Sequence, residues 1–440
     1  MASTYLSRTL GTSTNTYKGT VSVWFKKSQV SSDQVIYGNY TSGTQRGKLV
    51  VAGDGKLMYY QNDAGSVTIQ LETTRLFRDF SAFYHVVLSV DTTQASSSDR
   101  VKLYVNGVQE TAFDTATYPS QNTVFYLNAD SVTNYIGQEG NSSDYWDGSM
   151  SYFSVVDGTA YDASYFGETD SSSGIWKIKT GPSVTYGTNG FFLKMDTSSP
   201  GTDTSGNNNT FTASGTPTLT QDNASNNFAV FNPIANGGTN LTITNCNTTV
   251  YDSDSTWRSG FGGLAPSSGK WYFEAKRVGS SSNAWVGIMD SSQLDGTGTY
   301  KLTAKSRGYG YSASGEKGNS GSESAWGNTY TQNDIIGVAM DLDNQKIYFS
   351  KNGTWENSGV PTSGSTGTGS MYDLASGYNY YPATSLYSTS AGFSFNFGNG
   401  FFGETAVTSS NADAAGHGLM EYAVPSGYYT LNTKNLNTYG

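Results

Sequence analysis

The chain has 440 residues and a formal net charge of −10, and it contains 52 glycines and a single cysteine, Cys246. An acidic chain whose basic residues never cluster beyond a pair is repelled by phosphate backbones and anionic lipids, which excludes nucleic acid and membrane surfaces as preferred partners. No run of about 18 apolar residues predicts membrane insertion. No secretory signal opens the sequence and no intrachain disulfide is possible, so the chain relies on core burial in a reducing compartment.

Strands with one buried face are predicted throughout the first half of the chain. Val86, Leu88 and Val90 share one parity in an apolar run, which is typical of an antiparallel strand with one wet face. Helix formers are scarce, and one helical turn is expected at Asp162–Phe166. Besides a hairpin near residue 84, the expected strands are Gly19–Lys27, Gln34–Tyr37, Lys48–Val51, Leu57–Gln61, Val67–Leu71, Val132–Gly137, Gly148–Val156 and Phe191–Met195.

A hairpin of the same pattern occurs twice. Near residue 84 an apolar strand ends at Asp91 and its partner strand runs into Asn106-Gly107, and near residue 335 the same order of residues leads to Asn352-Gly353. Asn and Gly reach positive φ at little cost, so Asn-Gly between alternating apolar runs is a strong hairpin signal. Two distant copies predict two β-domains of related architecture.

A segment rich in Ser, Thr, Asn and Gly separates the two halves. We therefore expect a first domain over residues 1–200, a connector over 201–227 and a second domain over 228–440. Within the connector, Asp203–Asn209 fits either a flexible linker or an Asx-turn loop, and the loop is favoured.

The second half continues the strand pattern. A Gly/Ser/Thr loop over 359–370 lacks an apolar anchor and is expected to be mobile, and a helical turn is expected at Asn411–Ala415. Besides the hairpin, the expected strands are Asn240–Thr244, Lys270–Val278, Ala284–Met289, Gly308–Ser312, Tyr381–Tyr387 and Gly392–Phe397. The chain is thus predicted to be all-β, with two antiparallel, jelly-roll-like β-sandwich domains in tandem.

Several ordered motifs resemble known domains. The second unit resembles a SPRY domain in Gly269–Glu274, Asp334–Gly353, Tyr381–Ala383 and Phe395–Gly398. The first unit is similar to the laminin-G or concanavalin A-like lectin/glucanase superfamily in Tyr84–Val87, Lys102–Gly107 and Tyr145–Gly148.

The ordered pair of units also resembles uncharacterised virion proteins of marine tailed bacteriophages. The resemblance implies a virion protein made in the host cytoplasm and released by lysis, with other virion proteins as partners, assembly as a trimer, and further chain beyond Gly440. The stretches that carry it are Tyr5–Thr9, Thr115–Asn122, Phe166–Asp170 and Leu431–Leu436.

Catalytic patterns are weak in this sequence. Catalysis by the glycosidases of this superfamily resembles a retaining mechanism, in which two carboxylates lie about 5 Å apart on one strand. Such a pair needs acidic residues at alternate positions of a single strand, and no strand of the first unit has them. Asp341 and Asp343 flank a hairpin turn, and His85 lies within a strand, where a structural role is the more common one. We therefore expect a protein that is not an enzyme.

Calcium is the one cofactor that the sequence leaves open. Converging loop oxygens are needed, and three pairs offer them: Asp144 with Asp147, Asp203 with Asn207, and Asp252 with Asp254. Structural turns explain the same residues, because Asp and Asn commonly hydrogen-bond the backbone of a turn.

Binding through loop aromatics is the favoured function. Sugar rings stack on Trp and Tyr, and avidity from many copies strengthens weak single sites. The first hypothesis is a tail-fibre, tail-tip or head-fibre adhesin for host-surface glycan or protein, the second a capsid or tail decoration protein, and the third a glycoside hydrolase. The candidate ligand-binding residues are Tyr145, Trp146, Trp257, Trp326, Tyr330, Trp355, Tyr372 and Tyr378.

Overall fold

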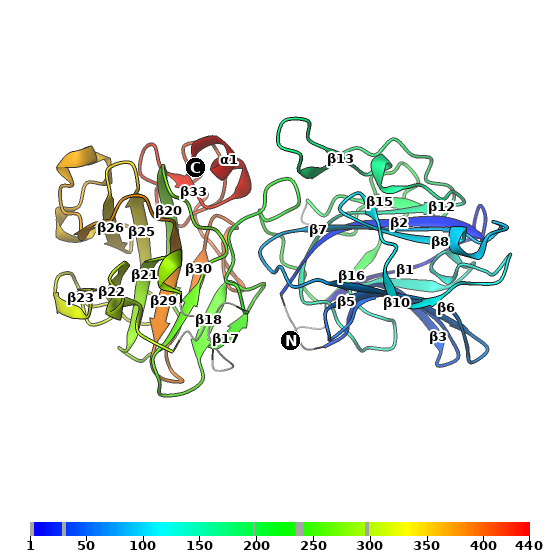
Figure 1. Cartoon of the computed structure of the whole chain (residues 1–440), viewed down its shortest axis with the longest axis horizontal. Helices are drawn as coiled ribbons and strands as arrows, with labels where there is room; N and C mark the ends of the chain where they lie inside the picture. Colours follow the sequence, from blue (N-terminus) through cyan, green and yellow to red (C-terminus); the bar gives the residue numbers. More distant parts are fainter. Residues whose placement is uncertain (1–3, 29–31, 197–198, 235–240, 295–298) are drawn as a thin grey trace. The chain divides into compact units, whose positions relative to one another are not determined.

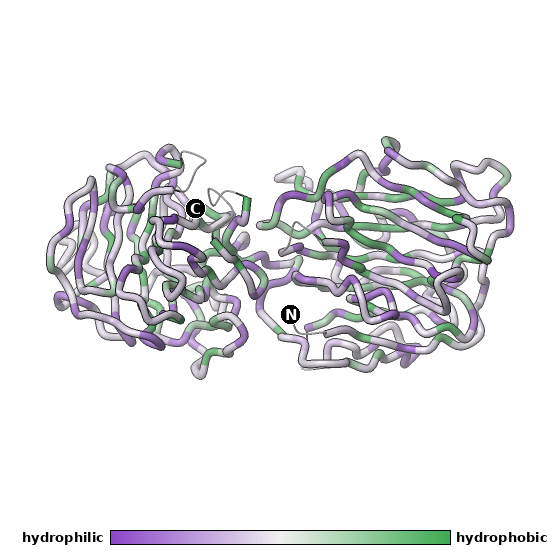
Figure 2. Tube along the Cα trace, turned by 90° about the horizontal axis from the view of Figure 1, so that it is seen from below, coloured by the Kyte–Doolittle hydropathy of each residue, from purple (hydrophilic) through white to green (hydrophobic). Residues whose placement is uncertain are grey.

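The computed structural model describes residues 4–28, 32–196, 199–234, 241–294 and 299–440, in two separate units (Figure 1). The first unit comprises residues 1–219 and 223–225, and the second comprises 220–222 and 226–440. Each has two antiparallel sheets around its own apolar core. In both units the hydrophobic stretches lie along the strands, whereas the loops are mostly hydrophilic (Figure 2). The prediction of two tandem β-sandwiches is confirmed.

Two sheets form the layers of the first unit, as Figure 1 shows. The eight-stranded sheet has the order β10 (Phe113–Thr117), β6 (Ser66–Leu76), β5 (Lys56–Asp63), β4 (Gln45–Val51), β3 (Gln34–Ser42), β11 (Thr133–Ile136), β1 (Tyr5–Thr9) and β16 (Thr212–Ser214). The six-stranded sheet has the order β15 (Phe191–Leu193), β12 (Gly148–Asp157), β2 (Lys18–Lys27), β7 (Tyr84–Asp91), β8 (Val101–Val105) and β9 (Val108–Gln109). The connections include the 3₁₀ helices η1 (Ser97–Asp99), η2 (Tyr126–Asn128) and η3 (Ala163–Tyr165), and the hairpin of β13 (Gly167–Thr169) and β14 (Trp176–Ile178).

A further layer of chain covers the outer face of the six-stranded sheet. It runs from η3 through the β13–β14 hairpin, and β13 lies beyond this sheet in Figure 1. Trp176 of β14 donates a hydrogen bond from Nε1 to Nδ1 of His85 (3.0 Å), and the imidazole stacks on Trp24 with a centroid separation of 4.6 Å. The expectation of a structural role for His85 agrees with these contacts.

The second unit repeats the two-sheet arrangement. One sheet has the order β17 (Leu241–Thr244), β18 (Thr249–Asp252), β30 (Gly392–Asn396), β20 (Lys270–Arg277), β25 (Ile335–Asp341), β26 (Lys346–Lys351) and β27 (Thr354–Trp355), with β28 (Tyr372–Asp373) on β26 and β33 (Tyr429–Thr430) on β20. The other has the order β19 (Arg258–Phe261), β29 (Tyr380–Leu386), β21 (Ala284–Asp290), β22 (Gly308–Ser312), β23 (Glu316–Asn319) and β24 (Ser322–Ala325). The remaining elements are η4 (Ser291–Gln293), η5 (Leu302–Ala304), η6 (Glu356–Ser358), η7 (Pro361–Thr366), β31 (Phe401–Phe402), β32 (Thr405–Ala406) and α1 (Thr433–Tyr439).

The C-terminal segment covers one sheet face of the second unit. Met420 and Tyr428 pack on Tyr272, Ala339 and Tyr348 of strands β20, β25 and β26. The buried carboxylate of Glu274 on β20 accepts hydrogen bonds from the backbone N–H groups of residues 421 (2.9 Å) and 422 (2.8 Å). Each unit therefore covers one of its sheet faces with chain that follows the hairpin in sequence.

The two hairpins of the chain share the same hydrogen bond at their Asn-Gly turns. Oδ1 of Asn106 accepts from the N–H of His85 (2.9 Å), and Oδ1 of Asn352 accepts from the N–H of Ile335 (2.8 Å). Asn106 has a φ of 47° and Asn352 a φ of 48°. The side chain at the turn thus accepts a hydrogen bond from the start of the partner strand in both units, from the second residue of β7 and the first of β25.

The segment predicted as a connector is largely part of the first unit. Residues 201–219 belong to that unit, where β16 pairs with β1, and the change of unit lies near residue 220, within the predicted connector. The pairing of β16 was hidden because Thr212–Ser214 is too short and polar to give a strand signal.

Three other loop predictions have mixed outcomes. The turn near Asp162 is confirmed as η3. The loop over 359–370 contains η7. Its Pro361 is buried and accepts a hydrogen bond from Tyr428 Oη (2.8 Å), so the prediction that this loop lacks an anchor was wrong. No helix forms at Asn411–Ala415, whereas α1 was not predicted, and the Asn240 end of one predicted strand lies outside the described residues.

Replacing Gly107 with Ala is expected to destabilise the first unit by about 2 kcal/mol more than replacing Gly174 with Ala. Both glycines have positive φ, 82° and 71°, so both variants carry the same backbone penalty. A Cβ at Gly107 would lie 2.5 Å from the Trp176 ring, but a Cβ at Gly174 meets nothing within 4 Å. Urea unfolding of the two variants measures the difference, and equal losses would contradict the packing of Trp176 at this turn.

Candidate binding face

Five half-buried tyrosines lie on the outer face of the eight-stranded sheet, and we call this surface the tyrosine face. Side chains alternate between the faces of a strand. Leu6, Tyr59 and Ile136 point into the core, so their neighbours in sequence point outward. The tyrosine face consists of Tyr5 on β1, Tyr135 on β11, Tyr40 on β3, Tyr60 on β5 and Tyr145 on the loop that follows β11.

Ring contacts join three of these tyrosines, Tyr5, Tyr135 and Tyr145. The ring centroid of Tyr5 lies 5.8 Å from that of Tyr135 and 6.4 Å from that of Tyr145. At Gly140, an added Cβ would lie 2.7 Å from the Tyr135 ring and 3.2 Å from Cβ of Tyr40, so this glycine lets the loop settle between them. Strands β1, β11, β3, β4 and β5 are consecutive, and at about 4.8 Å per strand the tyrosine face spans roughly 19 Å.

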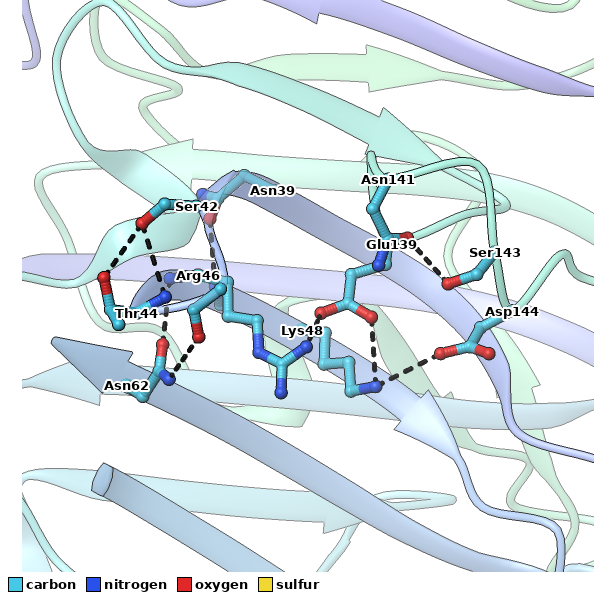
Figure 3. A network of polar contacts seen from close by, with 12 residues as sticks. Asn39, Ser42, Thr44, Arg46, Lys48, Asn62, Glu139, Asn141, Ser143 and Asp144 are labelled. Carbon is cyan, nitrogen blue, oxygen red and sulfur yellow. Dashed lines mark hydrogen bonds and ion pairs between the residues drawn. The ribbon is translucent and has the colours of Figure 1, made fainter. Parts of the chain in front are cut away.

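A buried carboxylate fixes the loop that follows β11 to the sheet, as Figure 3 shows. Glu139 is 1% exposed, and its oxygens contact Nη1 of Arg46 (2.9 Å) and Nζ of Lys48 (3.2 Å). Nζ of Lys48 also lies 3.3 Å from Oδ2 of Asp144. The guanidinium of Arg46 continues over the ring of Tyr60, at 5.4 Å from its centroid. The charges at the centre of the tyrosine face are therefore paired with one another.

The carboxylates proposed as calcium ligands in this loop have protein partners. Asp144 shares the ammonium of Lys48 with Glu139, and Asp147 accepts a hydrogen bond from Oγ of Ser28 (2.5 Å). The positive charge that a metal ion would supply here comes from Lys48. Among the described residues, no group of three or more His, Cys, Asp or Glu side chains gathers as a metal site requires.

Asp203 serves the backbone of its own loop. Its carboxylate accepts hydrogen bonds from the N–H groups of Phe192 (2.9 Å), Ser205 (2.8 Å) and Asn209 (2.7 Å), and from Oγ of Ser205 (2.9 Å). Four donors occupy both oxygens, so the prediction of Asp203 as a calcium ligand is corrected to an Asx-turn role. The preference for a structured loop at Asp203–Asn209 is confirmed.

The two predicted aromatics of the first unit have different surroundings. Tyr145 belongs to the tyrosine face. Trp146 packs edge-on against Phe25 at the margin of the core, with a centroid separation of 5.1 Å. The other members of the face went unnoticed in the sequence, although the alternation of Tyr5 with Leu6 and of Tyr135 with Ile136 was the available signal.

Comparison with known families assigns both units. Residues 2–163 match the concanavalin A-like lectin/glucanases superfamily, and residues 270–400 match the SPRY domain. A concanavalin A-like domain precedes a SPRY domain in this chain. No curated protein matches the sequence.

Solved structures similar to this chain include two human SPRY domains and a toxin. The SPRY domain of human HERC1 is 17% identical with a TM-score of 0.31, and the match covers 38% of this chain and 96% of that one. A second human SPRY domain is 17% identical with a TM-score of 0.27, covering 36% and 94%. Stonustoxin is 14% identical with a TM-score of 0.30, covering 38% of this chain and 27% of the toxin.

Cations cover three of the aromatics predicted in the SPRY domain. Nζ of Lys301 lies 4.6 Å from the ring centroid of Trp257. Cζ of Arg307 lies 4.1 Å from the centroid of Tyr378, and Nζ of Lys317 lies 5.1 Å from that of Tyr372. A ring face that already holds a cation is not free to stack on a sugar.

The remaining three predicted aromatics separate by burial. Tyr330 is 2% exposed and donates a hydrogen bond to the carbonyl of Tyr311 (2.9 Å), so its prediction as a ligand-binding residue is wrong and it belongs to the core. Trp326 is half-buried and packs edge-on against Tyr311 (5.4 Å). Trp355 is half-buried and borders a hollow.

Proposed function

We propose that this chain is a non-enzymatic surface protein of a bacteriophage particle, at a tail fibre, tail tip or head fibre, which binds a neutral glycan on the host surface. The gathering of five half-buried tyrosines on one sheet face, from strands β1, β11, β3 and β5 and the loop that follows β11, is the observation that carries this proposal. Strand spacing of about 4.8 Å is close to the length that one sugar adds to an extended chain, so successive rings suit successive sugars.

The charges of the tyrosine face favour a neutral ligand over an anionic one. Arg46 and Lys48 are neutralised by Glu139 and Asp144, which leaves no basic group for a sulfate or carboxylate. The net charge of −10 also opposes an anionic polymer. Tyrosine supplies an apolar ring and a polar hydroxyl with few torsions to fix, which suits a polyol.

The phage context rests on the sequence resemblance described above. Trimeric or other repeated presentation on a particle would multiply a weak single-site affinity, since linked sites gain about 10² to 10⁴ in avidity. Among the described residues, no helix has the length and apolar composition that a bilayer crossing requires.

The double variant Tyr5→Ala/Tyr135→Ala is expected to bind host cells and neutral glycans roughly tenfold more weakly, because each lost ring removes about 0.5–1.5 kcal/mol of stacking. Binding of the multimerised full chain to a glycan array and to whole cells measures the effect. Tyr165→Ala is the matched control, because Tyr165 is 41% exposed and lies outside the tyrosine face.

A decoration role within the particle is the second candidate function. Among the described residues, the most exposed large hydrophobic side chains are Val108 (63%) and Ile175 (64%). Val108 follows Gly107 and Ile175 precedes Trp176, whose ring packs at the Gly107 turn, and exposed apolar side chains of this kind suit contact with a neighbouring virion subunit. Phage particles that lack this protein can be added to the glycan-array and whole-cell assay. Binding of the full chain to those particles, without binding to cells or glycans, would favour decoration over adhesion.

A further inference from the structure

A hollow of about 380 Å³ opens at the Asn352-Gly353 turn of the SPRY domain. It lies between the segment before β25 and the short strand β27, and its lining includes Thr329, Thr354, Trp355 and Glu356. Its volume falls within the range of roughly 300–1,000 Å³ that is typical of small-ligand sites.

The floor of the hollow is a buried carboxylate. Glu356 is 5% exposed, and its Oε2 accepts hydrogen bonds from both the backbone N–H and Nδ2 of Asn328, at 3.0 Å each. An added Cβ at Gly327 would lie 3.0 Å from the same oxygen and 2.9 Å from Oη of Tyr311. Glycine at position 327 therefore lets the chain pass close to this carboxylate, and the two hydrogen bonds from Asn328 orient it.

Three residues around the hollow have a left-handed backbone. Asn352, Asn357 and Ser358 have φ of 48°, 50° and 52°, a region that asparagine enters at little cost and serine less readily. Nδ2 of Asn357 donates to the carbonyl of Trp326 (3.2 Å), which ties the end of β27 back to the opposite wall.

The walls combine one aromatic ring with exposed hydroxyl groups. Trp355 packs edge-on against Tyr272, with a centroid separation of 6.4 Å, and no cation–π contact involves it among the described residues. Thr329 and Thr354 are exposed beside it. An indole next to hydroxyl and amide groups offers stacking to the C–H face of a pyranose and hydrogen bonds to its hydroxyls.

The charges at the hollow disfavour an anionic ligand. Lys351 donates to the carbonyl of Thr329 (2.8 Å) and lies 3.3 Å from Oδ2 of Asp334, while Glu356 is satisfied by Asn328. A carboxylated or sulfated sugar would meet the carboxylate of the floor without an unpaired cation to bind it.

We propose that this hollow is a second ligand site, independent of the tyrosine face, which takes a single neutral hexopyranose unit. One chain then carries two different sugar sites in two units. Simultaneous occupancy makes the second binding event intramolecular, which raises the overall affinity without new contacts.

Fluorine NMR of the full chain labelled with 5-fluorotryptophan tests this site. The chain has 8 tryptophans, and the Trp355 resonance is assigned with Trp355→Phe. The ligands are the methyl glycosides of glucose, galactose, mannose and N-acetylglucosamine at millimolar concentration. We expect one of them to shift the Trp355 resonance saturably.

Blocking and control variants separate this site from the others. Thr354→Arg places a long side chain in the hollow and is expected to weaken the response at least tenfold. Thr242→Arg on the exposed edge strand β17 is the matched control and retains it, as does Tyr5→Ala/Tyr135→Ala. No saturable shift with any of the four glycosides, or an undiminished shift in Thr354→Arg, overturns the proposal. Loss of the response in Tyr5→Ala/Tyr135→Ala overturns its independence from the tyrosine face.

Discussion

Acidification from about pH 7.5 to about pH 5 is expected to destabilise the concanavalin A-like domain and to stabilise the SPRY domain, each by roughly 2 kcal/mol. In each domain we assign the change to one buried group that titrates near this window, His85 in the first and Glu274 in the second, and their pKa values are displaced with opposite consequences for stability. Differential scanning calorimetry of the full chain measures the two transitions, and each is expected to move by roughly 5 °C.

His85 is the group that responds in the first domain. Burial lowers the pKa of its imidazole from 6.5 to about 3. Nδ1 accepts from Trp176, so Nε2 holds the proton and donates to Oγ of Ser22 (2.9 Å). As the pH falls below 6.5, the unfolded chain gains a proton that the folded domain does not, and each further pH unit costs about 1.4 kcal/mol of stability.

Glu274 is the group that responds in the SPRY domain. Burial raises the pKa of its carboxyl from 4.5 to about 7, against the opposing effect of hydrogen bonds from the N–H groups of Glu421 and Tyr422 and from Tyr272. The folded domain therefore binds a proton at a higher pH than the unfolded chain. This contribution to stability is fully present below pH 4.5 and is lost as the pH rises through about 7.

Two variants assign the opposite shifts to these groups. His85→Gln is expected to remove the pH dependence of the first transition, and Glu274→Gln that of the second, between pH 5 and 7.5. The exposed carboxylates titrate mostly below this window. If both transitions moved in the same direction, or if the variants kept the slopes of the wild type, the assignment would be refuted.

Replacing Glu139 with Ala is expected to lower the stability of the first domain by about 3–5 kcal/mol. The change leaves the ammonium of Lys48, whose side chain is 10% exposed, with only Asp144 beside it, and deprives Arg46 of its partner. The loop that carries Tyr145 also loses its anchor, so glycan binding is expected to fall with stability. Urea unfolding and the glycan-binding assay measure the two effects.

An exposed ion pair provides the control for Glu139. Glu168 lies 3.4 Å from Lys177, with both side chains 48% exposed, so Glu168→Ala is expected to cost less than about 1 kcal/mol. The double variant Glu139→Gln/Lys48→Met removes the buried cation together with its partner and is expected to recover most of the loss. A loss in Glu139→Ala as small as that in Glu168→Ala would be evidence against the anchoring role.

The strands and the hairpin turns could be predicted because their signals are local. Alternation of apolar side chains identified β2, β7 and β25 within one or two residues, and Asn-Gly identified both turns with their left-handed φ values. The motifs also distinguished the two domain families. These features depend on residues within one strand or one turn, where period-two patterning and the conformational freedom of Asn and Gly act directly.

The exposure of the aromatics depended on segments far away in the sequence. Tyr330 and Tyr145 both follow turn residues, yet Tyr330 is enclosed by Tyr311 and Phe393 from other strands, and Tyr145 stays at the surface beside Tyr5. The pairing of Asp144 with Lys48 was hidden for the same reason, because Lys48 comes from a strand 96 residues before Asp144.

The sequence by itself determined an all-β chain of two sandwiches with matching hairpins, because pleat alternation and turn chemistry are encoded by near neighbours. Only the tertiary structure decided which sheet faces the chain covers and which stay open. Burial of Trp176 against His85 covers one face, and the pairing of Glu139 with Arg46 and Lys48 builds another. Such contacts join residues that no local pattern relates, since they form only when the sheets have brought distant strands together.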